Sequence, residues 1–267
     1  MIIKTPAIVL RQHPYTETSR VITWLTPDEG RLNTLIKGAM RPKSAFLGQI
    51  DLFYTCELLY YGRNRDGLPA TREVTPLQTR ERLRGDWRAC AVASYLCSLV
   101  SRATPEKATQ HDVFNWLEAA LDDVAAHGAS SAILCWHELR LLDLLGHAPQ
   151  LRACRTCGAP ATETGERAFS AKDGVWWCPD CAAREARRDL LRVPADTVRR
   201  LGAWQEDRSP ARARAESISF STLAGMERLL GAFIAYQLDI PPGPRIAALD
   251  ILSRNPAQPV DRAGRLR

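Results

Sequence analysis

The chain has 267 residues, of which 45% are hydrophobic and 25% are charged. This composition excludes wholesale disorder and collagen-like or mucin-like repeats, and the length predicts one to three compact domains with cores of their own. The 36 basic residues outnumber the 30 acidic ones and leave a net charge of +6, which points to a polyanionic partner or, alternatively, only to solubility.

The first residues, MIIKTPAIVLRQHPY, carry one lysine but lack the apolar core and cleavage site of a signal peptide. No stretch approaches the roughly 18 continuous apolar residues of a membrane span. We therefore expect a cytoplasmic protein without a membrane partner. In a reducing compartment its 8 cysteines do not predict disulfides. Four of them lie in apolar surroundings and are expected to be small buried hydrophobes, namely Cys56, Cys90, Cys97 and Cys135.

Short segments of β type open the chain, at residues 6–10, 20–26, 31–37, 52–61 and 71–75. Turn sequences such as PDEG and GRNRDG separate them, and Gly30 gives the first of these turns the backbone freedom that a hairpin needs. Strands of this length and spacing predict a small barrel or sandwich, which we assign to residues 1–78.

The stretch RLNTLIKGAMRPK, residues 31–43, carries four cations and no acidic residue. A cation-rich loop on a small barrel is suited to hold a phosphate backbone, because its cations displace condensed counterions; a solvated basic loop is the alternative. Bases stack on exposed aromatic rings, although most rings of this region are expected in the core. The candidate phosphate-binding cations are Arg31, Lys37, Arg41 and Lys43, with Arg11 and Arg20 extending the same face, and the interleaved aromatic residues are Tyr15, Trp24, Phe46, Phe53, Tyr54, Tyr60 and Tyr61.

Helical periodicity begins after Pro76 and predicts an all-α domain over residues 79–254. Apolar residues at three- and four-residue spacing indicate helices at 83–99, 112–127, 131–145, 194–204, 219–238 and 245–254. Gly128 and Gly146 are placed to end the second and third helices, and Ser130 or Ser131 is expected to cap the third. Residues 255–267, with two prolines and a charged end, are expected to form a disordered tail.

Residues 147–183 interrupt this helical pattern with prolines, glycines and two CxxC pairs. Cys154, Cys157, Cys178 and Cys181 have the spacing of two zinc knuckles, and the sequence between the pairs predicts a hairpin turned at Asp173 and Gly174. A redox site or an accidental cluster is the alternative, but a redox site needs only one CxxC, near a βαβ unit. Four thiolates leave no open coordination position, so we expect one structural zinc ion.

A second group of cations flanks the cysteine module, at Arg184, Arg187, Arg188 and Arg192. Glu185 and Asp189 lie among them, so ion pairs on a solvated helix face are favoured over a nucleic-acid surface.

Catalysis finds little support in the sequence. There is no HExxH, GxSxG, P-loop or GxGxxG motif. His137 lies within an apolar helix and is expected to be packed and hydrogen-bonded, while the adjacent Asp122 and Asp123 point to different sides of their helix. We therefore expect a protein that is not an enzyme.

The chain resembles the bacterial RecO recombination mediators. The resemblance is carried by AIVLRQHPYTETSRVITWLTPDEGRLNTLIKGAMRPKS and by the helical body that the two CxxC pairs interrupt. It implies an N-terminal OB-fold barrel, a helical C-terminal domain and an embedded zinc motif. It also implies binding of single- and double-stranded DNA, annealing of complementary strands and, with RecR, loading of RecA onto DNA coated by single-strand-binding protein. On this basis Lys37, Arg41 and Lys43 are expected to contact phosphates, with Arg31 close by.

The resemblance also implies capture of the acidic, Phe-terminated tail of single-strand-binding protein on the helical domain. Residues 133–145 and 223–240 offer apolar stripes with Arg140 and Arg228 among them. The alternative is that the apolar positions belong to the core and that both arginines are only solvated.

The competing functional hypothesis is a zinc-ribbon and OB protein that binds RNA or assists transcription. A nucleic-acid-processing enzyme is the third hypothesis. The DNA partner implies association with the nucleoid.

Overall fold

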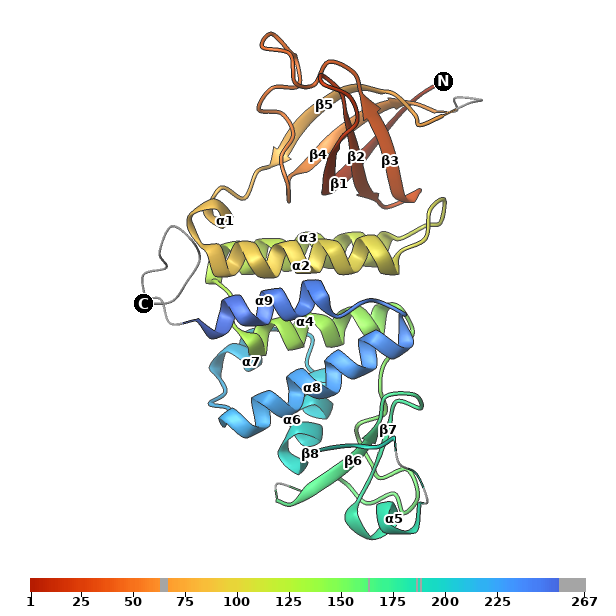
Figure 1. Cartoon of the computed structure of the whole chain (residues 1–267), viewed down its shortest axis with the longest axis vertical. Helices are drawn as coiled ribbons and strands as arrows, with labels where there is room; N and C mark the ends of the chain where they lie inside the picture. Colours follow the sequence, from red (N-terminus) through yellow and green to blue (C-terminus); the bar gives the residue numbers. More distant parts are fainter. Residues whose placement is uncertain (63–66, 163, 186, 188, 255–267) are drawn as a thin grey trace.

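The structure is a computed structural model that describes residues 1–62, 67–162, 164–185, 187 and 189–254. A β-barrel lies at one end of the elongated molecule, the helices form its middle, and the cysteine module lies at the other end (Figure 1). This is the α+β multidomain architecture that the sequence predicts. The tail predicted over residues 255–267 lies outside the described residues.

The N-terminal domain is a five-stranded antiparallel sheet in the order β3-β2-β1-β4-β5. Strand β1 pairs with β2 and with β4, and its register with β2 shifts between Val9 and Arg11. The backbone N–H of Leu35 donates to the carbonyl of Pro69 at 2.8 Å, which brings β3 beside the start of β5 and closes the sheet. The predicted OB-like barrel is thus confirmed. Its strands are β1 (Ile2–Pro14), β2 (Arg20–Thr26), β3 (Gly30–Ile36), β4 (Thr55–Tyr61) and β5 (Thr71–Gln78).

The barrel has a core of its own, because alternate side chains of its strands point inward. Inside it, the Trp24 indole donates to the Thr34 hydroxyl at 2.8 Å, and that hydroxyl lies 2.7 Å from the Thr71 hydroxyl, which joins β2, β3 and β5. Ile8 and Leu25 point the other way and pack into the core of the helical domain. The core of the barrel comprises Ala7, Val9, Ile22, Trp24, Ile36, Tyr54, Cys56, Leu58, Tyr60 and Val74.

Capping residues set where the helices begin. The predicted helix over residues 83–99 is broken at Asp86, whose carboxylate accepts hydrogen bonds from the backbone N–H groups of Arg88 and Ala89 and starts α2. Ser130 caps α4, as predicted. No helix of the described residues is long and apolar enough to cross a membrane. The helices of this domain are α1 (Arg82–Gly85), α2 (Trp87–Ala103), α3 (His111–His127), α4 (Ser131–Leu144), α6 (Ala195–Glu206), α7 (Ala211–Ala215), α8 (Phe220–Gln237) and α9 (Gly243–Ser253).

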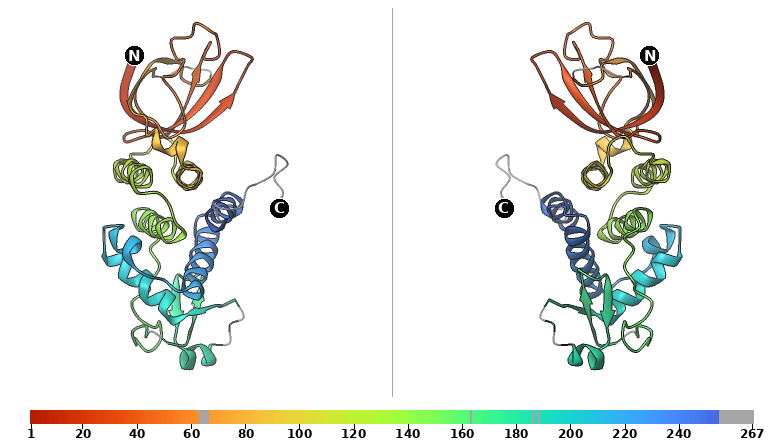
Figure 2. Two further views of the ribbon diagram at one scale, coloured as in Figure 1. Left: turned by 90° about the vertical axis from the view of Figure 1, so that its left-hand side faces the viewer. Right: turned by 90° about the vertical axis from the view of Figure 1, so that its right-hand side faces the viewer.

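Figure 2 shows α8 and α9 diverging from α6 and α7, with α4 beside the opening between them. A buried ion pair ties α9 to α4: the Arg245 guanidinium donates to both carboxylate oxygens of Glu138, at 2.6 and 2.9 Å. The Tyr95 hydroxyl of α2 donates to the same carboxylate at 2.6 Å. These three side chains therefore join α2, α4 and α9 within an otherwise apolar core.

Arg80 joins the barrel to the helices. Its side chain is 1% exposed. The guanidinium donates to the Phe53 carbonyl at 2.6 Å and the Thr55 hydroxyl at 3.0 Å in the barrel, and to the Asp122 carboxylate of α3 at 2.6 Å. The barrel is thus held against α3 by one buried cation.

Candidate metal centre and nucleic-acid interface

The cysteine module is built on a three-stranded sheet in the order β7-β6-β8. The predicted hairpin turn is confirmed, with Gly174 at a φ of 67° between β6 (Glu166–Ser170) and β7 (Val175–Trp177). The third strand, β8 (Leu191–Pro194), was not predicted. Strand β7 leads directly into Cys178, and α5 (Pro179–Arg184) carries Cys181 in its first turn. The backbone N–H of Arg155 donates to the Trp176 carbonyl at 2.9 Å, which fixes the first CxxC beside this strand.

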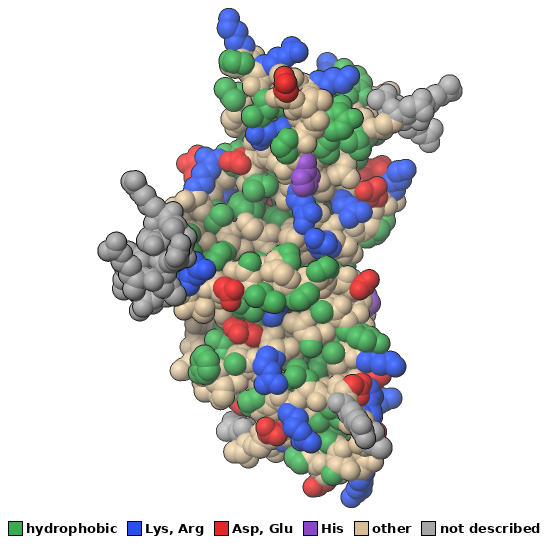
Figure 3. All heavy atoms as spheres, in the orientation of Figure 1, with side chains coloured by type: hydrophobic (Ala, Val, Ile, Leu, Met, Phe, Trp, Pro, Cys, Tyr) green, Lys and Arg blue, Asp and Glu red, His purple; other side chains and the backbone are tan. Residues whose placement is uncertain are grey.

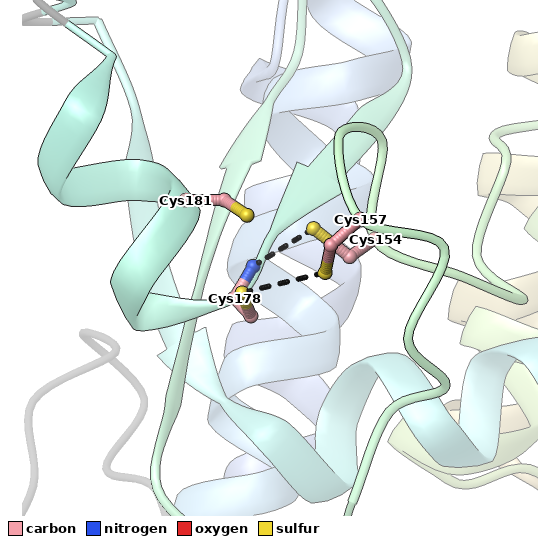
Figure 4. Close-up of side chains that lie close together, drawn as sticks. All are labelled: Cys154, Cys157, Cys178 and Cys181. Carbon is pink, nitrogen blue, oxygen red and sulfur yellow. Dashed lines mark hydrogen bonds between the residues drawn. The ribbon is translucent and has the colours of Figure 1, made fainter.

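The four cysteine side chains converge on one point (Figure 4). All four sulfur atoms lie within 4.8 Å of one another, and the Cys157 and Cys178 sulfurs are 3.9 Å apart. A tetrahedral ion with metal–sulfur distances of about 2.3 Å separates its ligands by about 3.8 Å. The backbone N–H of Cys178 also donates to the Cys154 sulfur at 3.4 Å, which favours a thiolate there. The donor set and its geometry therefore fit a single tetrahedral metal ion.

The pKa values of Cys154 and Cys181 are shifted in opposite directions. Burial raises the pKa of Cys154, but hydrogen bonds from the backbone N–H groups of Cys157, Cys178 and Thr156 outweigh it and lower the pKa to about 6. The side-chain hydrogen bond with Cys178 raises the pKa of Cys181 to about 12. A negative charge on the Cys154 sulfur therefore disfavours ionisation of the Cys181 thiol. A cation at the centre would remove this repulsion.

The basic loop lies at the end of the barrel that is farthest from the helices (Figure 1). Lys37, Arg41 and Lys43 are exposed, and none of them has a carboxylate partner within the described residues. The Arg41 N–H donates to the Gly38 carbonyl at 3.1 Å, and Gly38 has a φ of 69°, so the loop turns tightly at this point. Lys and Arg side chains gather at this end of the molecule (Figure 3).

The other three candidate cations of the barrel have partners within the protein. Arg11 donates to the Ser98 hydroxyl of α2 at 3.0 Å, and Arg20 donates to the Gln12 amide oxygen at 2.6 Å. Arg31 donates to the Ser101 carbonyl at 2.6 Å and lies 3.4 Å from the Glu106 carboxylate. Arg11 and Arg31 therefore help to seat the barrel on the helices, whereas the exposed loop cations have no such role.

The arginine group beside the cysteine module is divided between paired and exposed residues. Arg187 pairs with Asp173 and Asp189. Arg184 is exposed, and Arg192 lies at 4.0 Å from the Glu166 carboxylate. Arg188 lies outside the described residues.

A cavity of about 340 Å³ opens between α3, α4 and the segment before α7. It takes in Arg140, which is 9% exposed and pairs with Asp143 at 2.9 Å. Arg228 does not line it and donates instead to the Arg192 carbonyl at 3.2 Å. The lining residues are Asp112, Asn115, Trp116, Ala119, Ala120, Asp123, Trp136, His137, Arg140, Leu144, Arg208 and Pro210.

The sequence gives little indication of this cavity. Trp116 and Trp136 line it, but the apolar periodicity of their helices does not distinguish them from core residues. The indole nitrogens of Trp116 and Trp136 are buried and have no hydrogen-bond partner in the described part of the chain. His137 is packed and hydrogen-bonded as predicted, at 3.3 Å from Asp123. Asp122 and Asp123 point to different sides, also as predicted, since the first pairs with Arg80 and the second with Arg214.

Comparison with known proteins identifies the family. Residues 1–80 match the family model described as "Recombination protein O N terminal", and residues 84–245 match "Recombination protein O C terminal". The DNA repair protein RecO of Roseiflexus sp. (strain RS-1) is 35% identical over 240 residues, which cover 90% of this chain and 82% of that protein. The DNA repair protein RecO of Dehalococcoides mccartyi is 28% identical over 254 residues, or 94% of this chain and 96% of that protein. The chain therefore belongs to the RecO family of DNA repair and recombination mediators.

Proposed function

We propose that the protein binds single- and double-stranded DNA, anneals complementary strands and, together with RecR, loads RecA onto DNA coated by single-strand-binding protein. The observation that carries this proposal is the group of three exposed cations without carboxylate partners on the barrel of a RecO-family chain. The protein then acts by binding and positioning, without catalysis, and works at the nucleoid in the cytoplasm.

The DNA interface is assigned to Lys37, Arg41 and Lys43, whose charges are free to displace counterions. Replacing all three by glutamine should lower the magnitude of the log–log salt slope for single strands by about 2, at roughly 0.7 for each phosphate that the variant no longer neutralises. The matched control replaces three exposed cations of the cysteine module. These control positions are Lys172, Arg184 and Arg192.

The two triple variants separate the candidate surfaces. A slope that changes only in the barrel variant supports the proposed interface. A salt slope that changes only in the control variant would indicate that DNA binds to the cysteine module instead. Binding of structured RNA in preference to DNA, without annealing of complementary strands, would instead favour the RNA-binding alternative.

We propose that the metal held by the four cysteines is zinc, since four thiolates in a tetrahedron are the donor set that zinc prefers. With all four positions taken by protein ligands, the ion supplies structure and no reaction chemistry. Elemental analysis should find one zinc ion per chain, and replacement of Cys154 and Cys178 by serine should abolish it. Replacement of the half-buried Cys90 by serine is the control and should leave the zinc content unchanged. Zinc retained in the double variant would refute the assignment.

The tail of single-strand-binding protein is assigned to the cavity at Arg140. The cavity offers indole and leucine surface for the terminal phenylalanine, and Arg140, which also pairs with Asp143, lines it as a cation for a carboxylate. Arg228 is no longer part of the proposed groove, because it lies beside β8.

A calorimetric titration of the full chain with an acidic, Phe-terminated peptide tests this assignment. We expect micromolar binding that Arg140→Met weakens and that Arg228→Met leaves unchanged. Equal binding by a peptide without the phenylalanine would show that the cavity is not the site.

A further inference from the structure

Two loops meet at the far end of the barrel. One is the β1–β2 connection, residues 15–19, and the other is the basic loop, residues 37–43. Arg20 pairs with Ile36 in the β2–β3 ladder, so both loops leave the same end of adjacent strands. The Met40 N–H then donates to the Thr18 carbonyl at 3.0 Å, which holds the two loops side by side. They form one surface.

The β1–β2 loop is fixed by its own hydrogen bonds. The Tyr15 N–H donates to the Ser19 carbonyl at 2.9 Å, and the Ser19 N–H donates to the Thr16 hydroxyl at 3.1 Å. Yet the Tyr15 side chain is 62% exposed, and its hydroxyl has no hydrogen-bond partner within the described residues. Met40, across the junction, is 50% exposed. A rigid backbone therefore presents an aromatic ring and a thioether to solvent, beside three cations.

The two loops together carry more cations than carboxylates. Lys37, Arg41 and Lys43 belong to the adjoining loop, and Glu17 is the one carboxylate in residues 11–27. A protein partner with an apolar patch would gain little binding energy from the neighbouring cations. A nucleic-acid strand with unpaired bases carries both a flat apolar face and a phosphate row, which match the ring and the cations respectively.

We propose that Tyr15 is a stacking platform for an unpaired base, flanked by Met40, while the loop cations hold the phosphates of the same strand. This inference rests on the proposed function and goes beyond it, because it assigns a contact that distinguishes a single strand from a duplex. Bases in a duplex are already stacked on each other, so the ring contributes nothing to duplex binding. The phosphate contacts serve both forms.

The test compares the full chain with Tyr15→Ala and Tyr15→Phe on three probes. These are an oligothymidine, an abasic strand of equal length and a duplex. Tyr15→Ala should weaken oligothymidine binding about 5- to 150-fold, the effect of removing one base–aromatic stack. Its salt slope should not change. Tyr15→Phe keeps the ring and should bind as the unaltered protein does. Tyr236→Ala, which removes a tyrosine that is 56% exposed on α8, is the matched control.

The outcomes separate this inference from the proposed function. The inference is overturned if Tyr15→Ala binds oligothymidine normally while the triple cation variant shows the expected smaller salt slope. The ring would then be free for a protein contact. It is overturned equally if Tyr15→Ala weakens binding to the abasic strand and the duplex as much as to oligothymidine. If neither the tyrosine nor the cations affect DNA binding, both the inference and the proposed barrel interface fail. The Glu17→Gln variant should strengthen binding to all three probes.

Discussion

Replacing Arg80 by methionine should weaken the junction between the barrel and the helices, which the packing of Ile8 and Leu25 still holds together. Methionine keeps the apolar stem but removes every donor, so the buried Phe53 carbonyl and Thr55 hydroxyl each lose a hydrogen bond. A buried group left without its partner costs about 1–3 kcal/mol. Loss of the ion pair with Asp122 costs less, because the Asp122 side chain is 46% exposed and water can replace the guanidinium. The two buried groups together therefore predict a loss of about 2–6 kcal/mol.

Thermal unfolding measures this loss. For a chain of this size about 1 kcal/mol corresponds to about 2–4 °C, so the midpoint should fall by about 4–24 °C. The control is Arg84→Met. Arg84 also contacts the barrel, donating to the Asp51 carboxylate at 2.8 Å and the Tyr54 hydroxyl at 2.5 Å, but its side chain is 57% exposed. An exposed pair contributes little. If the thermal midpoints of the two variants fall equally, the argument that burial makes the Arg80 contacts more stabilising than those of Arg84 is wrong.

Two further predictions concern the helical core. Glu138→Gln leaves Arg245 as a buried cation without its counter-charge and should cost about 3–5 kcal/mol, measured by urea unfolding, whereas Glu138→Leu combined with Arg245→Met should cost less than the single change. Burial lowers the pKa of His137 below 6.5 in spite of its contact with Asp123, so the imidazole stays neutral to a lower pH in the folded protein than in the unfolded chain. The unfolded chain therefore takes up this proton first, and stability should fall as the pH drops below 6.5, by up to about 1.4 kcal/mol per pH unit, until the folded protein also protonates. The His137→Gln variant should lack this component between pH 7.5 and 5.5, and an unchanged slope would contradict it.

The strand pattern and the cysteine spacing could be predicted because they are local. Alternating β segments, the PDEG turn and two CxxC pairs each determine short-range geometry, and the structure has the barrel strands, the hairpin at Gly174 and the converged sulfurs. The same holds for the cap at Ser130. Helix α7 and strand β8 are five and four residues long, too short for periodicity to indicate.

The partners of the charged residues could not be predicted, because they come from distant parts of the chain. Arg31 looks like a DNA-binding cation in sequence, but its partner Ser101 lies 70 residues away. Arg80 carries no sequence signal at all, although it joins the two domains. Arg140 and Arg228 have similar sequence surroundings, yet only Arg140 lines a cavity. Tertiary contacts thus decide which cations are free.

Annealing of complementary strands coated with single-strand-binding protein tests the central claim most directly. The unaltered protein should accelerate annealing, and the variant in which Lys37, Arg41 and Lys43 are all replaced by glutamine should lose most of this acceleration while keeping its zinc and its thermal midpoint. The variant with Lys172, Arg184 and Arg192 replaced should anneal normally. Failure of the unaltered protein to anneal coated strands, or full annealing by the barrel variant, would contradict the account.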